Sequence, residues 1–295
     1  MKKTLLSFVA ILVGLFFVLT LMDLKGDYVV EEIIWNANKK LSEAARNPEV
    51  VPEKVFVQIA DQYQKVINNY PKSKHAPITH IFLGRVNLAK KDYKTARQKF
   101  NVVLEKFPDN KGICAEALSA IGSSYELENN WPEALRVYER LKSDYPMTDL
   151  GLSVPLYIAN HYAKNNQASD AQGAFSAAIA YYNKMAAENA ETAIGLKSFQ
   201  LLSNCYLAQK KWTDAVNVMG RILLKYPSPN VSVPMVRAVN AIVLTQIGDF
   251  DIAIQLYREY IDQNPKSPLN KTLSEMIKSF ENLKTKNIKV TEKEK

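Results

Sequence analysis

Apolar residues recur along this chain with the spacing of amphipathic helices, in a block that repeats. Large side chains stand eight positions before a series of prolines; they are Tyr63, Phe100, Tyr138, Met219 and Tyr257. An alanine stands four residues earlier in most copies, and these alanines are Ala96, Ala134, Ala171, Ala215 and Ala253. Residues four apart share one face of a helix, and alanine lets a neighbouring helix approach closely. Each block therefore predicts a helix with a tightly packed seam.

The prolines give the length of the block. Pro71, Pro108, Pro146, Pro227 and Pro265 are separated by 37, 38, 81 and 38 residues. The long gap holds one copy without proline, which Phe175 marks. Proline ends a helix, and the polar stretches KKDY, ENNW, QKKW and IGDF predict tight turns within the blocks. Each block therefore predicts two helices, and blocks must stack because one hairpin cannot bury its own apolar face.

One block is longer than the others. Phe175 and Met219 are 44 residues apart, and the excess falls in the alanine-rich stretch SAAIAYYNKMAAENAETA. This stretch predicts a second helix about two turns longer than its counterparts.

Small residues mark the first helix of each block, at Gly84, Gly122, Ala159, Ser203 and Ala241. With the alanine and aromatic positions, this pattern resembles the tetratricopeptide repeat family over about residues 52–280. The resemblance implies an all-α solenoid of about five to six helical hairpins, with blocks longer than the usual 34 residues. The run Tyr70-Pro71-Lys72-Ser73-Lys74-His75-Ala76 is similar to bacterial envelope members, of the Tol–Pal accessory and outer-membrane assembly lipoprotein type.

The amino terminus has a different character. Thr4 to Met22 is a run of 19 uncharged residues, nearly long enough as a helix to cross a hydrocarbon core of about 30 Å. Lys2 and Lys3 precede it and favour a cytoplasmic amino terminus. We expect a single transmembrane helix in the cytoplasmic (inner) membrane, with the bulk of the chain in the periplasm. A cleaved signal peptide is the alternative, and no cysteine lies near the run, which excludes lipoprotein processing.

These features predict five segments along the chain. Residues 1–3 form the cytoplasmic end, and residues 4–22 form the anchor. Residues 23–51 are a linker and a helix that caps the stack by pairing with residues 53–69. The solenoid occupies residues 52–283, and residues 284–295 (KTKNIKVTEKEK) are predicted to be a disordered basic tail, because they lack apolar periodicity.

The net charge of +8 is concentrated in residues 65–111. Within this range a basic patch is predicted at Lys90, Lys91, Lys94, Arg97 and Lys99. The patch is either a solvated helix face or a docking surface for an acidic partner or anionic headgroups. Nucleic acid is not an expected partner, because no aromatic-interleaved basic stripe is present.

The resemblance also implies a concave groove lined by the first helices. The ninth residue of each first helix points into it, and the candidate partner-binding residues are Arg85, Ser123, Asn160 and Asn204. These polar side chains suit the backbone amides of a bound peptide.

No constellation of residues indicates catalysis, a metal site or a cofactor. The three histidines are scattered, and Cys114 and Cys205 are predicted to be small buried side chains. The leading interpretation is a non-enzymatic scaffold, tethered to the membrane, that binds envelope proteins through its groove. The alternative is a structural subunit of a large membrane complex, or of a homo-oligomer, that uses the outer faces of the solenoid.

Overall fold

The computed structural model describes residues 26–293, with side chains over residues 26–285. The predicted cytoplasmic end and the predicted anchor at residues 4–22 lie outside the described residues. Within the described range, none of the helices combines the length and the apolar character that a membrane span requires.

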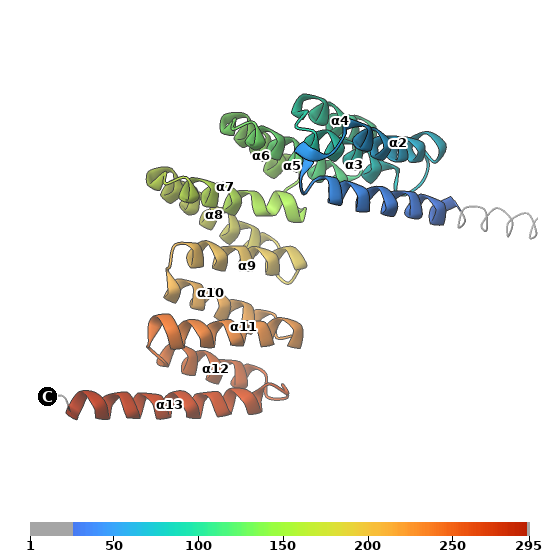
Figure 1. Ribbon diagram of the computed structural model, residues 1–295. Helices are drawn as coiled ribbons and strands as arrows, with labels where there is room; N and C mark the ends of the chain where they lie inside the picture. The colour runs from blue at the N-terminus through green and yellow to red at the C-terminus, as the bar shows by residue number, and fades with distance from the viewer. Residues whose placement is uncertain (1–25, 294–295) are drawn as a thin grey trace, which may run out of the picture. The chain divides into compact units, whose positions relative to one another are not determined.

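The described chain is helical, without a strand between residues 26 and 293 (Figure 1). A helix over residues 26–44 is followed by a 3-10 turn, Pro48–Val50. The remaining helices are α2 (Glu53–Asn69), α3 (Ala76–Ala89), α4 (Tyr93–Lys106), α5 (Lys111–Leu127), α6 (Trp131–Asp144), α7 (Asp149–Lys164), α8 (Ala168–Glu188), α9 (Ala193–Ala208), α10 (Trp212–Lys225), α11 (Pro229–Ile242), α12 (Asp251–Gln263) and α13 (Asn270–Lys293). The described range thus holds thirteen α-helices, more than five to six hairpins supply, because a final helix follows the last pair.

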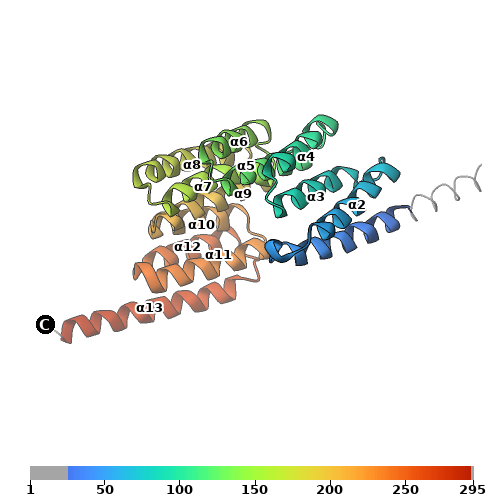
Figure 2. The ribbon, with the colours of Figure 1, turned by 45° about the horizontal axis from the view of Figure 1, so that its top comes forward.

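The chain forms two compact units, one up to Gly151 and one from Leu152. In the first unit, the helix over residues 26–44 lies beside α2 (Figure 2), and Ala37 and Leu41 share a core with Phe56 and Ile59. In the second unit, successive helices from α8 to α13 pack against one another.

The predicted seam is confirmed in the first unit. Ala96 and Ala134 are fully buried, and the aromatic rings that follow them by four residues, Phe100 and Tyr138, are buried as well. A Cβ atom at Gly122 would lie 2.5 Å from Cε1 of Tyr138, and one at Gly84 would meet the ring of Phe100 in the same way. The small residue of the first helix is therefore needed because an aromatic ring of the second helix occupies its side-chain space.

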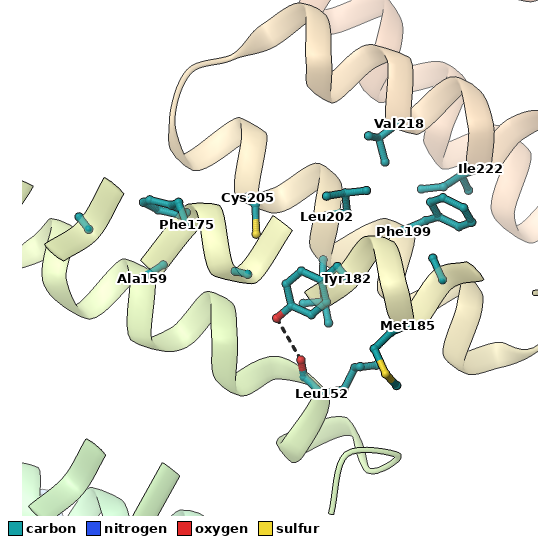
Figure 3. Packing of buried hydrophobic residues seen from close by; sticks show 14 residues of the cluster. Leu152, Ala159, Phe175, Tyr182, Met185, Phe199, Leu202, Cys205, Val218 and Ile222 are labelled. Carbon is teal, nitrogen blue, oxygen red and sulfur yellow. Dashed lines mark hydrogen bonds between the residues drawn. The ribbon is translucent and has the colours of Figure 1, made fainter. Parts of the chain in front are cut away.

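The long second helix of the third block is confirmed, since α8 has 21 residues where α4, α6 and α10 each have 14. Its added turns bury Tyr182, whose hydroxyl donates to the carbonyl oxygen of Leu152 at 3.0 Å (Figure 3). The amide of Leu156 donates to the same hydroxyl at 3.1 Å. In a regular α-helix the amide of Leu156 would donate directly to the carbonyl oxygen of Leu152. In α7 the Tyr182 hydroxyl stands between these two groups, next to Pro155, which has no amide hydrogen.

The predicted tight turns are confirmed, and they share one backbone conformation. One residue of each of these four turns has a positive φ between 57° and 74°; these residues are Lys91, Asn129, Lys210 and Gly248. Asn166 adopts the same conformation in the corresponding turn of the third block, which is not among the predicted turns. Only Gly248 adopts this left-handed conformation without a steric cost.

The prediction for Ala241 is wrong, because this residue is exposed rather than packed in the seam. The end of α11 continues into a π-helical turn, Val243–Ile247, in which Gly248 donates to the carbonyl of Val243 at 2.9 Å. A π turn holds one residue more than an α turn, so it rotates the preceding helix by one position. Asn240 therefore takes the place of Ala241, and it accepts a hydrogen bond of 2.6 Å from the hydroxyl of Tyr257.

The carboxyl-terminal segment also differs from the prediction, since α13 continues to Lys293 where disorder is predicted from residue 284. Leu273 and Phe280 are buried along its inner face. Beyond them, Lys284 Nζ lies 2.5 Å and 2.6 Å from the two carboxylate oxygens of Asp251 on α12. This ion pair extends the contact between the helices past the buried Phe280, which the local sequence pattern does not reveal.

Candidate protein-binding site

A hollow of about 400 Å³ opens on the first unit, between the helix over residues 26–44 and α3. It is lined by Asn38, Leu41, Ser42, Ala45, Phe82, Arg85, Leu88 and Ala89. Arg85 is a residue that the sequence places in the groove. The contribution of the capping helix is not predicted, because its register lies outside the repeat pattern.

Arg85 does not present a free charge to this hollow. Its Nη2 lies 2.6 Å from Oε1 of Glu116 on α5, and its guanidinium carbon lies 5.6 Å from the centre of the Phe82 ring. The pair joins the first helices of two consecutive blocks. Ser123 lies seven residues after Glu116, on the same face of α5, and is half-buried. The first unit therefore offers a nearly neutral polar face.

The second unit carries the other two predicted groove residues. Asn160 on α7 is half-buried, and Asn204 on α9 is exposed. Neither side chain makes a hydrogen bond with another described residue. Each amide has two donors and an acceptor for a partner, which is the chemistry that a peptide backbone needs.

Most of the predicted basic patch is neutralised by carboxylates from outside it. Lys90 Nζ lies 2.5 Å from Glu53, and Lys91 Nζ lies 2.6 Å from Glu49. The hydrogen bond from Lys91 lowers the pKa of the Glu49 carboxyl. Two members of the patch, Lys94 and Lys99, have no ion pair within the described part of the chain.

Arg97 has a structural role instead. It lies 2.6 Å and 3.3 Å from the two oxygens of Glu128 and 3.2 Å from Oγ of the buried Ser124. Its guanidinium carbon also lies 4.2 Å from the centre of the Tyr125 ring. These contacts fasten α4 to the carboxyl-terminal end of α5. Sequence analysis cannot detect such a pair, because the partners are 31 residues apart.

A larger hollow, of about 490 Å³, lies on the second unit between α11, α12 and α13. Its walls include Pro227, Pro229, Pro265 and Pro268, together with Tyr260. The buried hydroxyl of Ser232 also lines it and has no hydrogen-bond partner among the described residues. These prolines follow the second helices of the fourth and fifth blocks, at the turn into α11 and the turn into α13. Their spacing in the sequence does not predict that the two turns enclose a hollow.

The titratable groups of the described chain do not form a reaction centre. Cys114 and Cys205 are buried and free, as predicted, and burial raises the pKa of Cys205 to about 12. A thiol with this pKa stays protonated at neutral pH and is a poor nucleophile. Burial also lowers the pKa of His80, with help from the positive charges of Lys106 and Lys99. Residues 26–293 contain no cluster of three or more metal-ligating side chains.

Stacked helix pairs with small-to-aromatic seams define a helical-repeat protein, a class that binds partners along its faces. Family models of the tetratricopeptide repeat match residues 83–110, 117–149 and 198–229. These segments cover most of α3–α4, α5–α6 and α9–α10. These three segments match the tetratricopeptide repeat, a repeat that generally mediates protein–protein interaction; no enzyme family is among these matches.

Several solved structures are similar to this chain at low identity. BtubC from P. vanneervenii is 13% identical with a TM-score of 0.39, and the match covers 80% of this chain and 91% of that one. The TPR2AB domain of yeast Sti1, solved in a complex with pHSP90, is 11% identical with a TM-score of 0.31, covering 83% and 98%. The RpL4 assembly chaperone Acl4 is 10% identical with a TM-score of 0.31, covering 88% and 99%. No curated protein matches the chain.

Proposed function

We propose that this chain is a non-enzymatic scaffold that binds other proteins through the faces formed by the first helices of its repeats. The single observation that carries this proposal is the pair Asn160 and Asn204, which stand at equivalent positions of α7 and α9 with their amides unused by other described residues. A half-buried polar group such as the Asn160 amide is ordinarily satisfied, so an amide without a partner there, beside the exposed amide of Asn204, is suited to a peptide backbone.

We further propose that residues 4–22 tether the scaffold to the cytoplasmic membrane, with the repeats on the periplasmic side. The uncharged run and the preceding Lys2 and Lys3 support this orientation. The partners would then be envelope proteins. Protease added outside intact spheroplasts should cleave the repeats, and full protection would contradict the orientation.

The binding proposal is tested by affinity purification of the full chain from detergent-solubilised membranes. The test variant combines Arg85→Ala, Asn160→Ala and Asn204→Ala. The matched control combines Lys94→Ala, Gln98→Ala and Asn101→Ala, three exposed positions of α4. We expect the wild-type chain and the control to recover the same partners and the test variant to lose them. Equal recovery by all three chains would contradict a role for these faces.

A structural role through the outer faces is the second candidate. It is favoured by the pairing of Arg85 with Glu116, which neutralises the one cation among the four candidate partner-binding residues. A self-assembling scaffold would give a particle larger than one chain in detergent. The control variant on α4 would then disturb assembly, while the variant at Arg85, Asn160 and Asn204 would not.

A further inference from the structure

Two exposed aromatic side chains share one face of the helix over residues 26–44. Tyr28 is 69% exposed and Trp35 is 64% exposed, and no other described aromatic ring is as open. They are seven residues apart, which puts them on one side of the helix at a separation of about 10 Å. The opposite side buries Val30 and Ala37 in the first unit. The aromatic face is therefore not used in packing the described chain.

The neighbouring sequence indicates what covers this face. The uncharged run ends at Met22, only six residues before Tyr28, so even an extended chain keeps Tyr28 within about 20 Å of the end of the run. Tyrosine and tryptophan collect where a bilayer meets water, because each ring has an apolar body and a polar edge. We propose that the face formed by Tyr28 and Trp35 rests on the headgroup layer of a phospholipid bilayer, with the helix lying along its surface. This inference rests on the proposed anchor.

The lying orientation differs measurably from a helix that continues straight out of the membrane. Trp35 is 13 residues beyond Met22, which is about 20 Å along a continuous helix. The polar layer of each leaflet is only about 5–8 Å deep, so a straight helix would hold Trp35 in water. A helix along the surface keeps Tyr28 and Trp35 at the same depth, as interfacial amphipathic helices do. The depth of Trp35 therefore decides between the two orientations.

The charges around the aromatic face set the kind of lipid. Glu32 and Lys39 are exposed on the same side of the helix, and Lys39 Nζ lies 5.7 Å from the centre of the Trp35 ring. Asp27 and Glu31 are engaged by Lys74, at 3.7 Å and 3.4 Å. With acidic and basic groups interspersed, the face has no net attraction for an anionic surface. It fits a zwitterionic headgroup layer, and added anionic lipid should not strengthen the contact.

The experiment uses the full chain with Trp131→Phe and Trp212→Phe, so that Trp35 is the one tryptophan, and it is excited at a wavelength that tyrosine does not absorb. The chain is reconstituted in phosphatidylcholine vesicles, with and without lipid that carries a nitroxide at the headgroup. We expect a blue-shifted emission, a loss of Trp35 fluorescence to the nitroxide lipid, and protection from iodide in the water. In the control chain, Trp35→Phe is combined with Lys40→Trp; position 40 is exposed and lies about 140° around the same helix from Trp35. This reporter should be quenched more by iodide and less by the nitroxide lipid.

Flotation of the same vesicles separates the two proposals. A chain that does not float with the vesicles overturns both the anchor and the resting helix. In a second outcome, the chain floats, iodide quenches Trp35, and the nitroxide lipid leaves Trp35 fluorescence unchanged. This outcome overturns the resting helix and leaves the anchor standing. It would also indicate that a protein partner, rather than lipid, covers Tyr28 and Trp35.

Discussion

The second and fifth repeats have the same spacing of residues and pack differently. In both, a small residue of the first helix stands sixteen positions before a tyrosine of the second: Gly122 before Tyr138, and Ala241 before Tyr257. In the second repeat the tyrosine ring lies against the glycine. In the fifth repeat Ala241 is exposed, and the tyrosine hydroxyl bonds to Asn240 instead.

The difference shows that the backbone conformation after a helix determines which of its residues faces the neighbouring helix. The π-helical turn after α11 adds one residue between the seam and Gly248, so every earlier residue of α11 is turned by about 100°. The seam then presents a polar side chain, and Tyr257 satisfies its buried hydroxyl on Asn240 and on the carbonyl of Val236, at 2.6 Å and 3.4 Å. The same spacing thus gives a steric fit in one repeat and a hydrogen bond in the other.

The largest expected effect comes from enlarging the small residue. Gly122→Leu should lower the free energy of unfolding by roughly 2–3 kcal/mol, because the new side chain would occupy the space of the Tyr138 ring. The matched change Ala241→Leu should alter it by less than about 0.5 kcal/mol, because that position is exposed. Urea melts followed by circular dichroism measure both. Equal losses in the two variants would show that the repeats pack alike.

A second test removes the hydrogen bond of the fifth repeat. Tyr257→Phe should cost about 1–2 kcal/mol, because the half-buried Asn240 loses the hydroxyl that donates to it. In a double-mutant cycle with Asn240→Leu, the tyrosine change should cost much less, since the acceptor is already gone. If Tyr257→Phe costs the same in both backgrounds, the two side chains are not coupled and the described shift in register is wrong.

The sequence predicts those features that depend on residues close in the chain. The seam alanines, the tight turns and the length of α8 follow from spacing and turn chemistry, and the structure confirms them. The pairing of Arg97 with Glu128 does not follow, because it depends on how two blocks meet. The π turn does not follow either, because no residue of Val243–Ile247 distinguishes a π turn from an α turn in the sequence. The candidate groove residues stay a prediction, and the pairing of Arg85 with Glu116 does not follow from their spacing in the sequence.

The third test concerns the turns that follow the first helices. Gly248→Ala should cost about 1 kcal/mol, because alanine is strained at a φ of 74° although no atom would clash with its Cβ. Gly248→Asn should cost less, since Asn129 and Asn166 hold the same conformation in the second and third repeats. Thermal melts of the two variants give the comparison. A larger loss for asparagine than for alanine would contradict the common geometry of these turns.

The smallest expected effect compares the first two repeats at one buried position. His80 on α3 stands 38 residues before Leu118 on α5, and both are buried. Burial and the nearby Lys106 and Lys99 lower the pKa of His80 in the folded chain below its usual value of 6.5, so the folded state favours the neutral ring. The unfolded chain binds the proton at a higher pH than the folded chain does. The contribution of His80 to the free energy of unfolding is therefore complete above about pH 6.5 and falls as the solution becomes more acidic.

The variant His80→Leu has the residue of the second repeat at this position. At pH 6 it should not show the decrease in the free energy of unfolding, of at most about 1 kcal/mol, that His80 causes. Urea melts at pH 7.5 and pH 6 measure the difference, with His161→Gln as the control. An unchanged pH dependence in the His80→Leu chain would mean that this ring is protonated as easily in the folded state as in the unfolded one.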